Sequence, residues 1–333
     1  MKKISKITIC LTNICDMHCD YCYRYEDSII AKPNKFEYWQ DLLLYIMNTK
    51  DFDFDDNLAI HFTGGEPSLY FYDILEGIFT LRTLNKLKNI QTKFGMITNL
   101  FSPNDLLTLL ENKYMTPEDI SISYDYTGDY KDQYQIICLS ELIHYHGYNM
   151  KTKYYDICVK MAITKKTIPY LYEAYKHLRS LNYTNIGYYF VNGTNDYDDE
   201  KIREEFRQQL QKIKDYCDIS NIYIQNYNEF IHEKNNPFCT KLGELLYIDT
   251  EGTIWPCAFL SDDSKVHGIK DIEKYKIGNI FTGINKDRLY ISESNSTEWL
   301  DRFCPACSNE CKEKIRAMKQ IEIDVFTNGK GLK

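Results

Sequence analysis

Three cysteines near the start of the chain are the residues best suited to chemistry. Cys15, Cys19 and Cys22 form a Cys-x3-Cys-x2-Cys pattern directly after an apolar, strand-like run. A structural zinc ion usually takes four ligands, and no fourth ligand is obvious beside these three. Three thiolates on a cubane iron–sulfur cluster would leave one iron without a protein ligand, so that this iron can bind a substrate or cofactor directly. The spacing favours such an open cluster.

A second group of five cysteines lies near the other end of the sequence. Residues 245–255 have the pattern of a β-hairpin around a Glu-Gly turn, which would bring the thiols on either side of it to one end. A later Cys-x2-Cys pair would complete a site with four thiolates. By spacing alone, structural zinc and an iron–sulfur cluster fit this site equally well. The five cysteines are Cys239, Cys257, Cys304, Cys307 and Cys311.

The remaining four cysteines are Cys10, Cys138, Cys158 and Cys217, which lie in apolar or helical contexts and are predicted to be buried, inert thiols. The sequence shows no secretory signal and no apolar run long enough to span a membrane. Twelve cysteines without a signal indicate a cytoplasmic protein with metal or redox chemistry. Lys plus Arg total 40 against 48 for Asp plus Glu, and the net charge of -8 argues against nucleic acid and anionic membranes as partners.

Short β-branched runs alternate with helical periodicity over the first two thirds of the chain, which predicts six βα units. Six units are too few for a closed eight-stranded barrel and predict an α/β fold, a partial (β/α)6 TIM-like barrel with its active site at the carboxyl ends of the strands. The predicted strands are 4–11, 58–63, 91–98, 119–124, 157–164 and 185–191. The predicted helices are 36–49, 72–87, 104–112, 131–145, 168–181 and 199–217.

The periodicity weakens beyond about residue 226, where cysteines return and loop residues cluster. We therefore predict a barrel domain at 1–230 and, at 231–333, a small β-hairpin and helix domain that carries the second cysteine group. Within the second domain, residues 312–320 are predicted to be helical, and 321–333 are predicted to be a poorly packed tail.

The first cysteine motif, with aromatic Tyr21 before its last cysteine, resembles that of the radical S-adenosylmethionine (radical SAM) superfamily. A second element of that superfamily, Gly64-Gly65-Glu66-Pro67, follows the second predicted strand. Alone it would indicate only a tight turn. The glycines allow close backbone approach to a ligand, and Glu66 offers an acceptor for an ammonium group.

This resemblance implies a 4Fe–4S cluster and S-adenosylmethionine as cofactors. Gly64, Gly65 and Glu66 would then hold the amino group of S-adenosylmethionine. It further implies cofactor contacts by Tyr21 and by three residues at later strand ends, Asn99, Ser123 and Asp125.

The second cysteine group resembles the auxiliary-cluster extension of these enzymes. The full extension, the SPASM domain, uses about seven cysteines for two clusters, whereas five are present here. The resemblance therefore implies the shorter twitch form with one auxiliary 4Fe–4S cluster on Cys239, Cys257, Cys304 and Cys307. Cys311 could replace one of these ligands, bind a second incomplete cluster, or serve as a nearby thiol.

Enzymes with this layout mostly modify ribosomally made peptides (RiPP maturation), and a peptide maturase that forms a crosslink is the first hypothesis. Because the first predicted strand begins at about residue 4, we expect no leader-binding domain before it, and we expect a separate recognition protein or direct binding of the precursor peptide. Flavodoxin or ferredoxin is the reductant expected by analogy.

Two alternatives remain open. The first is a radical SAM dehydrogenase of a small molecule, such as a sugar or cyclitol alcohol, in which the auxiliary cluster accepts the second electron. The second is a non-catalytic metal-binding module with structural zinc in both sites.

Overall fold

The computed structural model describes residues 3–22, 39–50, 52–129, 134–145, 156–191, 196–216, 245–258, 275–284 and 309–327. Its strands are β1 (Ile4–Thr12), β2 (Phe54–Gly64), β3 (Gln91–Thr98), β4 (Ile120–Ser123), β5 (Cys158–Ile163), β6 (Ile186–Phe190), β7 (Leu245–Ile248), β8 (Thr253–Trp255), β9 (Gly278–Asn279) and β10 (Gly283–Ile284). Its α-helices are α1 (Trp39–Asn48), α2 (Phe71–Leu81), α3 (Thr83–Lys88), α4 (Pro103–Glu111), α5 (Tyr134–Tyr145), α6 (Leu171–Ser180), α7 (Glu200–Tyr216) and α11 (Asn309–Thr327). Short 3-10 helices are η1 (Pro67–Tyr70), η2 (Pro117–Asp119), η5 (Ile168–Tyr170) and η6 (Asp196–Asp198).

The chain forms two compact units, one built from residues 1–119 and 239–306 and the other from residues 120–238 and 307–333. The expected α/β class is confirmed, because β1 to β6 alternate with helices. β1, β2 and β3 are parallel neighbours in the first unit, and β4, β5 and β6 are parallel neighbours in the second. The predicted division into a barrel domain at 1–230 and a cluster-binding domain at 231–333 stays a prediction.

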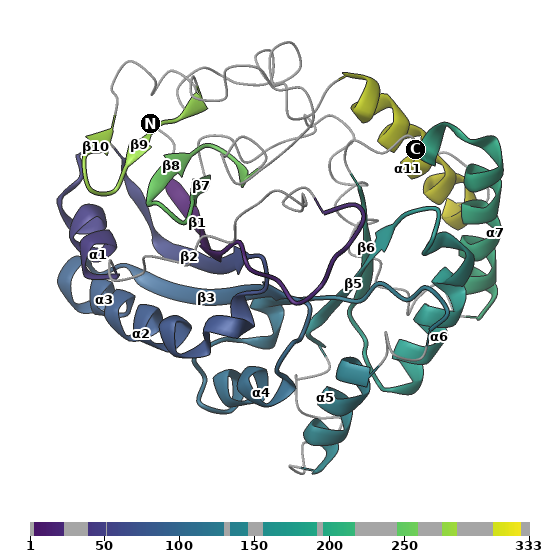
Figure 1. Cartoon of the computed structure of the whole chain (residues 1–333), viewed down its shortest axis with the longest axis horizontal. Coiled ribbons are helices and arrows are strands. Elements are labelled where there is room, and N and C mark those ends of the chain that lie inside the picture. Colours follow the sequence, from purple (N-terminus) through teal and green to yellow (C-terminus); the bar gives the residue numbers. More distant parts are fainter. Residues whose placement is uncertain are drawn as a thin grey trace. The chain divides into compact units, whose positions relative to one another are not determined.

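In the first unit, β7 adds to the far edge of β1 in parallel, and β8, β9 and β10 continue the sheet in antiparallel order. Figure 1 shows α1, α2 and α3 along one side of β2 and β3. The predicted hairpin at 245–255 is confirmed by β7 and β8. Its turn contains Gly252 at φ 76°, a left-handed conformation that glycine adopts without steric cost.

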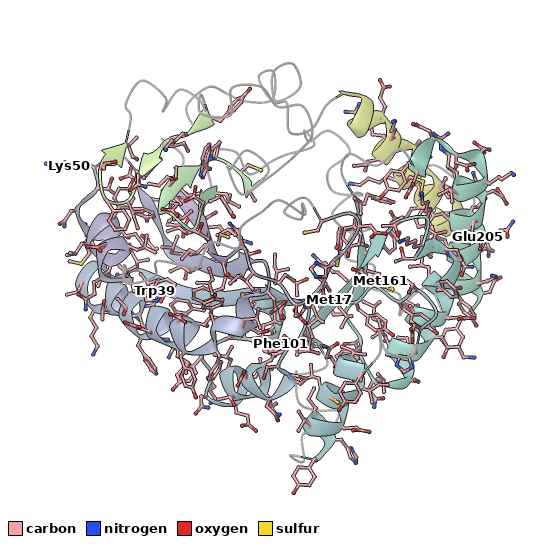
Figure 2. The ribbon with its side chains drawn as sticks, in the orientation of Figure 1. Met17, Trp39, Lys50, Phe101, Met161 and Glu205 are labelled. Carbon is pink, nitrogen blue, oxygen red and sulfur yellow. The ribbon has the colours of Figure 1, made fainter. Side chains whose placement is uncertain are left out.

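Every second side chain along β1 and β2 points into the core of the first unit. Ile7 and Ile9 of β1 pair in register with Ile60 and Phe62 of β2, and all four side chains are buried. Trp39, labelled in Figure 2, comes from α1 and meets the Phe62 ring edge-on at 5.8 Å between centroids. The sheet face that carries Phe62 is therefore the helix-covered face.

The opposite face of the same strands is more polar. Thr8 of β1 pairs with His61 of β2, and Cys10 pairs with Thr63, in the alternate positions of the same register. Thr8, His61 and Thr63 are half-buried, whereas Cys10 is buried. Cys158 is also buried, as predicted, and Cys138 is half-buried; Cys217 lies outside the described residues.

The predicted tail at the end of the chain is wrong for residues 321–327, which continue helix α11. Ile315, Met318, Ile321 and Val325 are buried, so the apolar stripe that starts in the predicted helix runs on past it. In the second unit α11 lies beside α7 (Figure 1), and the Lys214 ammonium of α7 donates to the Val325 carbonyl. No helix among the described residues is long and apolar enough to cross a membrane.

Glu322 is a buried carboxyl group within this helix contact, near Tyr188 of β6. Burial raises the pKa of Glu322 to about 7, although the Tyr188 hydroxyl and the Lys319 ammonium act in the opposite direction. The folded protein therefore binds a proton at Glu322 between pH 4.5 and 7 that the unfolded chain does not bind. The resulting stabilisation is complete below pH 4.5 and is lost as the pH rises through 7.

We expect Glu322→Gln to remove this pH dependence, which amounts to roughly 3 kcal/mol of unfolding free energy. Urea unfolding followed by circular dichroism at pH 5 and pH 8 measures it. The wild type should lose more stability between the two pH values than the variant does. Glu313→Gln, at an exposed position of α11, is the matched control and should behave like the wild type. Equal losses in the wild type and Glu322→Gln would contradict the assignment.

Candidate functional site

The cysteine motif lies in a turned loop at the carboxyl end of β1. Thr12 Oγ1 accepts the Ile14 N–H at 3.0 Å, and the Cys22 N–H donates to the Cys19 carbonyl at 2.9 Å. Cys15, Cys19 and Cys22 are all half-buried. Figure 2 labels Met17 in this loop and Phe101 just after β3, which mark the carboxyl ends of the two strands. The loop therefore occupies the edge where parallel sheets build their active sites.

The glycine motif at the end of β2 forms the support for this loop. The Gly65 N–H donates to the Thr12 carbonyl at 2.6 Å, and the Glu66 N–H donates to the Ile14 carbonyl at 2.8 Å. A Cβ atom on Gly65 would lie 2.0 Å from the Ile14 oxygen, and one on Gly64 would lie 2.3 Å from the Thr12 oxygen. The close approach that requires glycine is thus an approach to the backbone of the cysteine loop.

Glu66 fastens the end of β2 to the end of β3. Its side chain is 1% exposed, and its Oε1 accepts the Ser68 N–H at 2.9 Å, the Ser68 hydroxyl at 2.6 Å and the Thr98 hydroxyl at 2.5 Å. Oε2 accepts the Asn99 N–H at 2.6 Å. Burial raises the pKa of Glu66 despite these four hydrogen bonds. Acceptor capacity is left on Oε2, because a carboxylate oxygen can accept more than one hydrogen bond.

Asn99 brings the end of β3 to the cysteine loop. Its Nδ2 donates to Asp16 Oδ1 at 2.7 Å and lies 3.8 Å from the Cys15 sulfur. Its Oδ1 is buried and accepts no hydrogen bond from the described residues. A buried acceptor without a donor is costly, by about 1–3 kcal/mol, unless a ligand supplies the donor.

The surroundings of Cys15 disfavour a bare thiolate. The pKa of Cys15 is raised to about 11, mainly by burial and in smaller part by the nearby Asp16, Glu66 and Cys22. The hydrogen bond from the Met17 N–H acts in the opposite direction and lowers this pKa. The Met17 N–H lies 3.4 Å from the Cys15 sulfur. The thiolate form therefore needs a positively charged partner, as a metal centre provides when it displaces the thiol proton.

No three His, Cys, Asp or Glu side chains in the described part of the chain converge on a point that would hold one metal ion. A zinc ion needs its ligands around a single centre. A cubane cluster instead spreads three cysteines over three irons, so those sulfurs need not converge.

The other predicted cofactor contacts are those of Tyr21, Ser123 and Asp125. Tyr21 is half-buried between Cys19 and Cys22. Ser123 and Asp125 belong to the second compact unit, where Asp125 Oδ1 accepts the Ala162 N–H at 2.8 Å and so joins the end of β4 to β5. Their cofactor contacts stay predictions.

Of the second cysteine group, Cys257 follows β8 and is half-buried. Cys239, Cys304 and Cys307 lie outside the described residues, and Cys311 lies in α11 with its side chain outside the description. β8 runs antiparallel to β7, so Cys257 has returned towards the Leu245 end of that hairpin.

Three residues that support the site were missed by the sequence analysis. Asp16 stands inside the cysteine motif and Ser68 directly follows the glycine motif, and a polar side chain next to the key residues was the available signal. Asp249 shapes the hairpin turn before Cys257, because its Oδ1 accepts the Glu251 and Thr253 N–H groups and its Oδ2 accepts the Trp255 indole N–H at 2.7 Å. The Asp-x-x-x-Thr spacing of a turn was the signal there.

The comparison with protein families decides the identity. Residues 9–206 match the radical SAM superfamily, a span that contains the cysteine loop, the glycine motif and Asn99. The chain belongs to the radical SAM superfamily. This radical SAM protein is 26% identical to an uncharacterized protein of Methanocaldococcus jannaschii over 277 residues, which cover 81% of this chain and 90% of the relative.

Two solved structures share the fold of the radical SAM protein. The structure of anSMEcpe with bound AdoMet and a peptide gives a TM-score of 0.66 at 14% identity and covers 97% of this chain and 98% of that one. Streptococcus suis SuiB bound to S-adenosylmethionine gives a TM-score of 0.54 at 16% identity, with 89% of this chain and 68% of that one covered.

Membership of the superfamily makes this protein an enzyme that uses a 4Fe–4S cluster and S-adenosylmethionine, and the described residues fit both. Cys15, Cys19 and Cys22 would hold the cluster. The carboxylate of Glu66 and the orphaned Asn99 Oδ1 suit a ligand with an ammonium group and a positive sulfonium. When bound, the cluster and S-adenosylmethionine supply a 5'-deoxyadenosyl radical that removes a hydrogen atom from the substrate.

We expect Gly65→Ala to displace the cysteine loop, because its Cβ would overlap the Ile14 carbonyl oxygen. The variant should lose most of the change that S-adenosylmethionine produces in the electron paramagnetic resonance (EPR) spectrum of the reduced cluster. Gly283→Ala is the control, since its Cβ meets nothing within 4 Å although its φ of +87° is strained. An unaltered spectral response in Gly65→Ala would contradict the supporting role of the glycine.

Proposed function

We propose that this radical SAM enzyme modifies a ribosomally made peptide by removing a hydrogen atom and forming a crosslink or a similar modification. One observation carries the proposal: a structure that holds both AdoMet and a peptide matches 97% of the chain with a TM-score of 0.66. SuiB bound to its precursor peptide SuiA matches 90% of the chain with a TM-score of 0.52.

The sheet of the first unit offers a surface suited to such a substrate. The sheet face opposite α1 carries Thr8, His61 and Thr63, whose side chains are polar and half-buried. These side chains lie on β1 and β2, the strands that end in the cysteine loop and the glycine motif. A peptide has many backbone donors and acceptors, and it would find partners on such a face.

A separate auxiliary cluster on Cys239, Cys257, Cys304 and Cys307 is part of the proposal. Leu245 pairs with Lys6 at the start of β1, whereas the first cysteine loop follows Thr12. Lys6 and Thr12 are six residues apart on β1, a distance of roughly 20 Å along the strand. We therefore assign Cys257, which has returned towards the Leu245 end, to a cluster separate from the one that Cys15, Cys19 and Cys22 would hold. The auxiliary cluster would take the second electron when the substrate is oxidised.

The substrate class is tested with deuterium. Extract from cells of the native host grown in deuterated medium is separated into a peptide fraction and a small-molecule fraction, and each is given to the reconstituted enzyme with dithionite and S-adenosylmethionine. We expect 5'-deoxyadenosine to carry deuterium only with the peptide fraction, as measured by mass spectrometry. Cys19→Ala should give no 5'-deoxyadenosine. Deuterium from the small-molecule fraction alone would replace the peptide proposal with dehydrogenation of a sugar or cyclitol alcohol.

The auxiliary cluster has its own test. We expect Cys257→Ala to lose about four irons per chain and to keep reductive cleavage of S-adenosylmethionine, because the first cluster alone performs it. Cys19→Ala should lose a similar amount of iron together with the cleavage. Cys158→Ala, at a buried cysteine on β5, is the control for the loss of a thiol. Zinc instead of iron at the second site, or unchanged iron in Cys257→Ala, would overturn the proposed cluster.

A further inference from the structure

Asn99 links three parts of the first unit that meet at the cysteine loop. Its backbone N–H donates to Glu66 Oε2 at 2.6 Å, so the residue is fixed to the glycine motif. Its side-chain Nδ2 donates to Asp16 Oδ1 at 2.7 Å and lies 3.8 Å from the Cys15 sulfur. The Leu100 N–H is bound to Thr98 Oγ1 at 2.8 Å, which fixes the chain on both sides of Asn99.

The Cys15 sulfur is exposed to opposing electrostatic influences. The Met17 N–H at 3.4 Å and the Asn99 amide at 3.8 Å present positive hydrogens to it. The Asp16 carboxylate oxygen, 3.9 Å away, presents negative charge. Reduction adds an electron to an iron–sulfur cluster, so N–H groups at its sulfurs favour reduction and a nearby carboxylate disfavours it.

The Asn99 amide acts on both sides of this balance. By donating to Asp16 it offsets part of the carboxylate charge and holds the carboxylate in one place. By lying against the Cys15 sulfur it adds an N–H dipole to a cluster ligand. An apolar side chain of the same size would remove both effects, and an aspartate would set a second negative charge against Asp16.

We propose that Asn99 is a positioning residue that raises the reduction potential of the cluster held by Cys15, Cys19 and Cys22, through its hydrogen bond to Asp16 and its contact with the Cys15 sulfur. This role depends on the superfamily chemistry and is independent of whether the substrate is a peptide. Asp16 opposes Asn99 and lowers the same potential.

The test is a redox titration of the anaerobically reconstituted protein, followed by the EPR signal that responds to S-adenosylmethionine. At the potential where half of the wild-type cluster is reduced, we expect about a tenth of the Asn99→Leu cluster to be reduced, a tenfold change that equals roughly 59 mV for one electron. Asp16→Asn should shift the potential in the opposite direction.

Asn85→Leu is the matched control. Asn85 exchanges amide hydrogen bonds of 2.8 and 2.9 Å with Gln91, at the end of β3 opposite to Asn99, so the variant loses the same kind of contact without touching the loop. Its midpoint potential should equal that of the wild type. In the double variant Asn99→Leu/Asp16→Asn, the effect of losing Asn99 should shrink, because part of it acts through Asp16.

A wild-type midpoint in Asn99→Leu, or a shift in the same direction as Asp16→Asn, would overturn the proposal. Iron content and circular dichroism establish that each variant is folded and loaded. If Asn99→Leu takes up no iron, the isosteric Asn99→Asp decides, since the proposal requires its midpoint to be lower than that of the wild type. If Asn99 only stabilised the fold, the protein that does take up iron would keep the wild-type midpoint potential. That result would also reject the proposed influence of Asn99 on the reduction potential.

Discussion

The contact on which the site depends is the backbone pairing between the glycine motif and the cysteine loop. The N–H groups of Gly65 and Glu66 donate to the carbonyls of Thr12 and Ile14. Neither Gly64 nor Gly65 has room for a Cβ atom. These two hydrogen bonds extend the register of β1 and β2 beyond the strands into the loop. The position of the cysteines is therefore set by a rigid sheet, although the loop has no regular structure of its own.

Glu66 carries this order to β3 and sets the electrostatics of the site. Its carboxylate joins η1, Thr98 and Asn99, and its burial raises its pKa. Together with Asp16 it also helps to raise the pKa of Cys15. A site arranged in this way favours positive partners, namely the irons of a cluster and a cationic cofactor.

Two segments that lie far apart in the sequence, β1 and β7, share one sheet in the first unit. β7 pairs with β1 from Lys6↔Leu245 to Ile9↔Ile248, so the hairpin that precedes Cys257 is hydrogen-bonded to the strand that leads into the first cysteine loop. Asp249 closes the hairpin turn with three hydrogen bonds and is 2% exposed. This continuity fixes the position of Trp255, two residues before Cys257, along the sheet.

Local patterns in the sequence were enough to define most elements and the two motifs. The third strand was predicted at its observed bounds, Gln91–Thr98, and the cysteine spacing with Gly64, Gly65 and Glu66 pointed to the superfamily that the family comparison then established. The predicted helix at 72–87 divides at Arg82, whose guanidinium lies over the rings of Phe94 and Tyr114. Those partners come from other parts of the unit, and helical periodicity does not encode them.

The sequence by itself determined the chemistry, because the spacing of the cysteines and the glycines of the motif are local properties of the chain. Only the tertiary structure decided what each group contacts. The partners of Glu66 at Thr98 and Asn99 lie more than thirty residues away along the chain. Residues 321–327 were taken for a tail because their burial depends on α7 and β6 of the same unit. Such contacts arise from the pairing of distant elements, and a sequence pattern of short range cannot specify them.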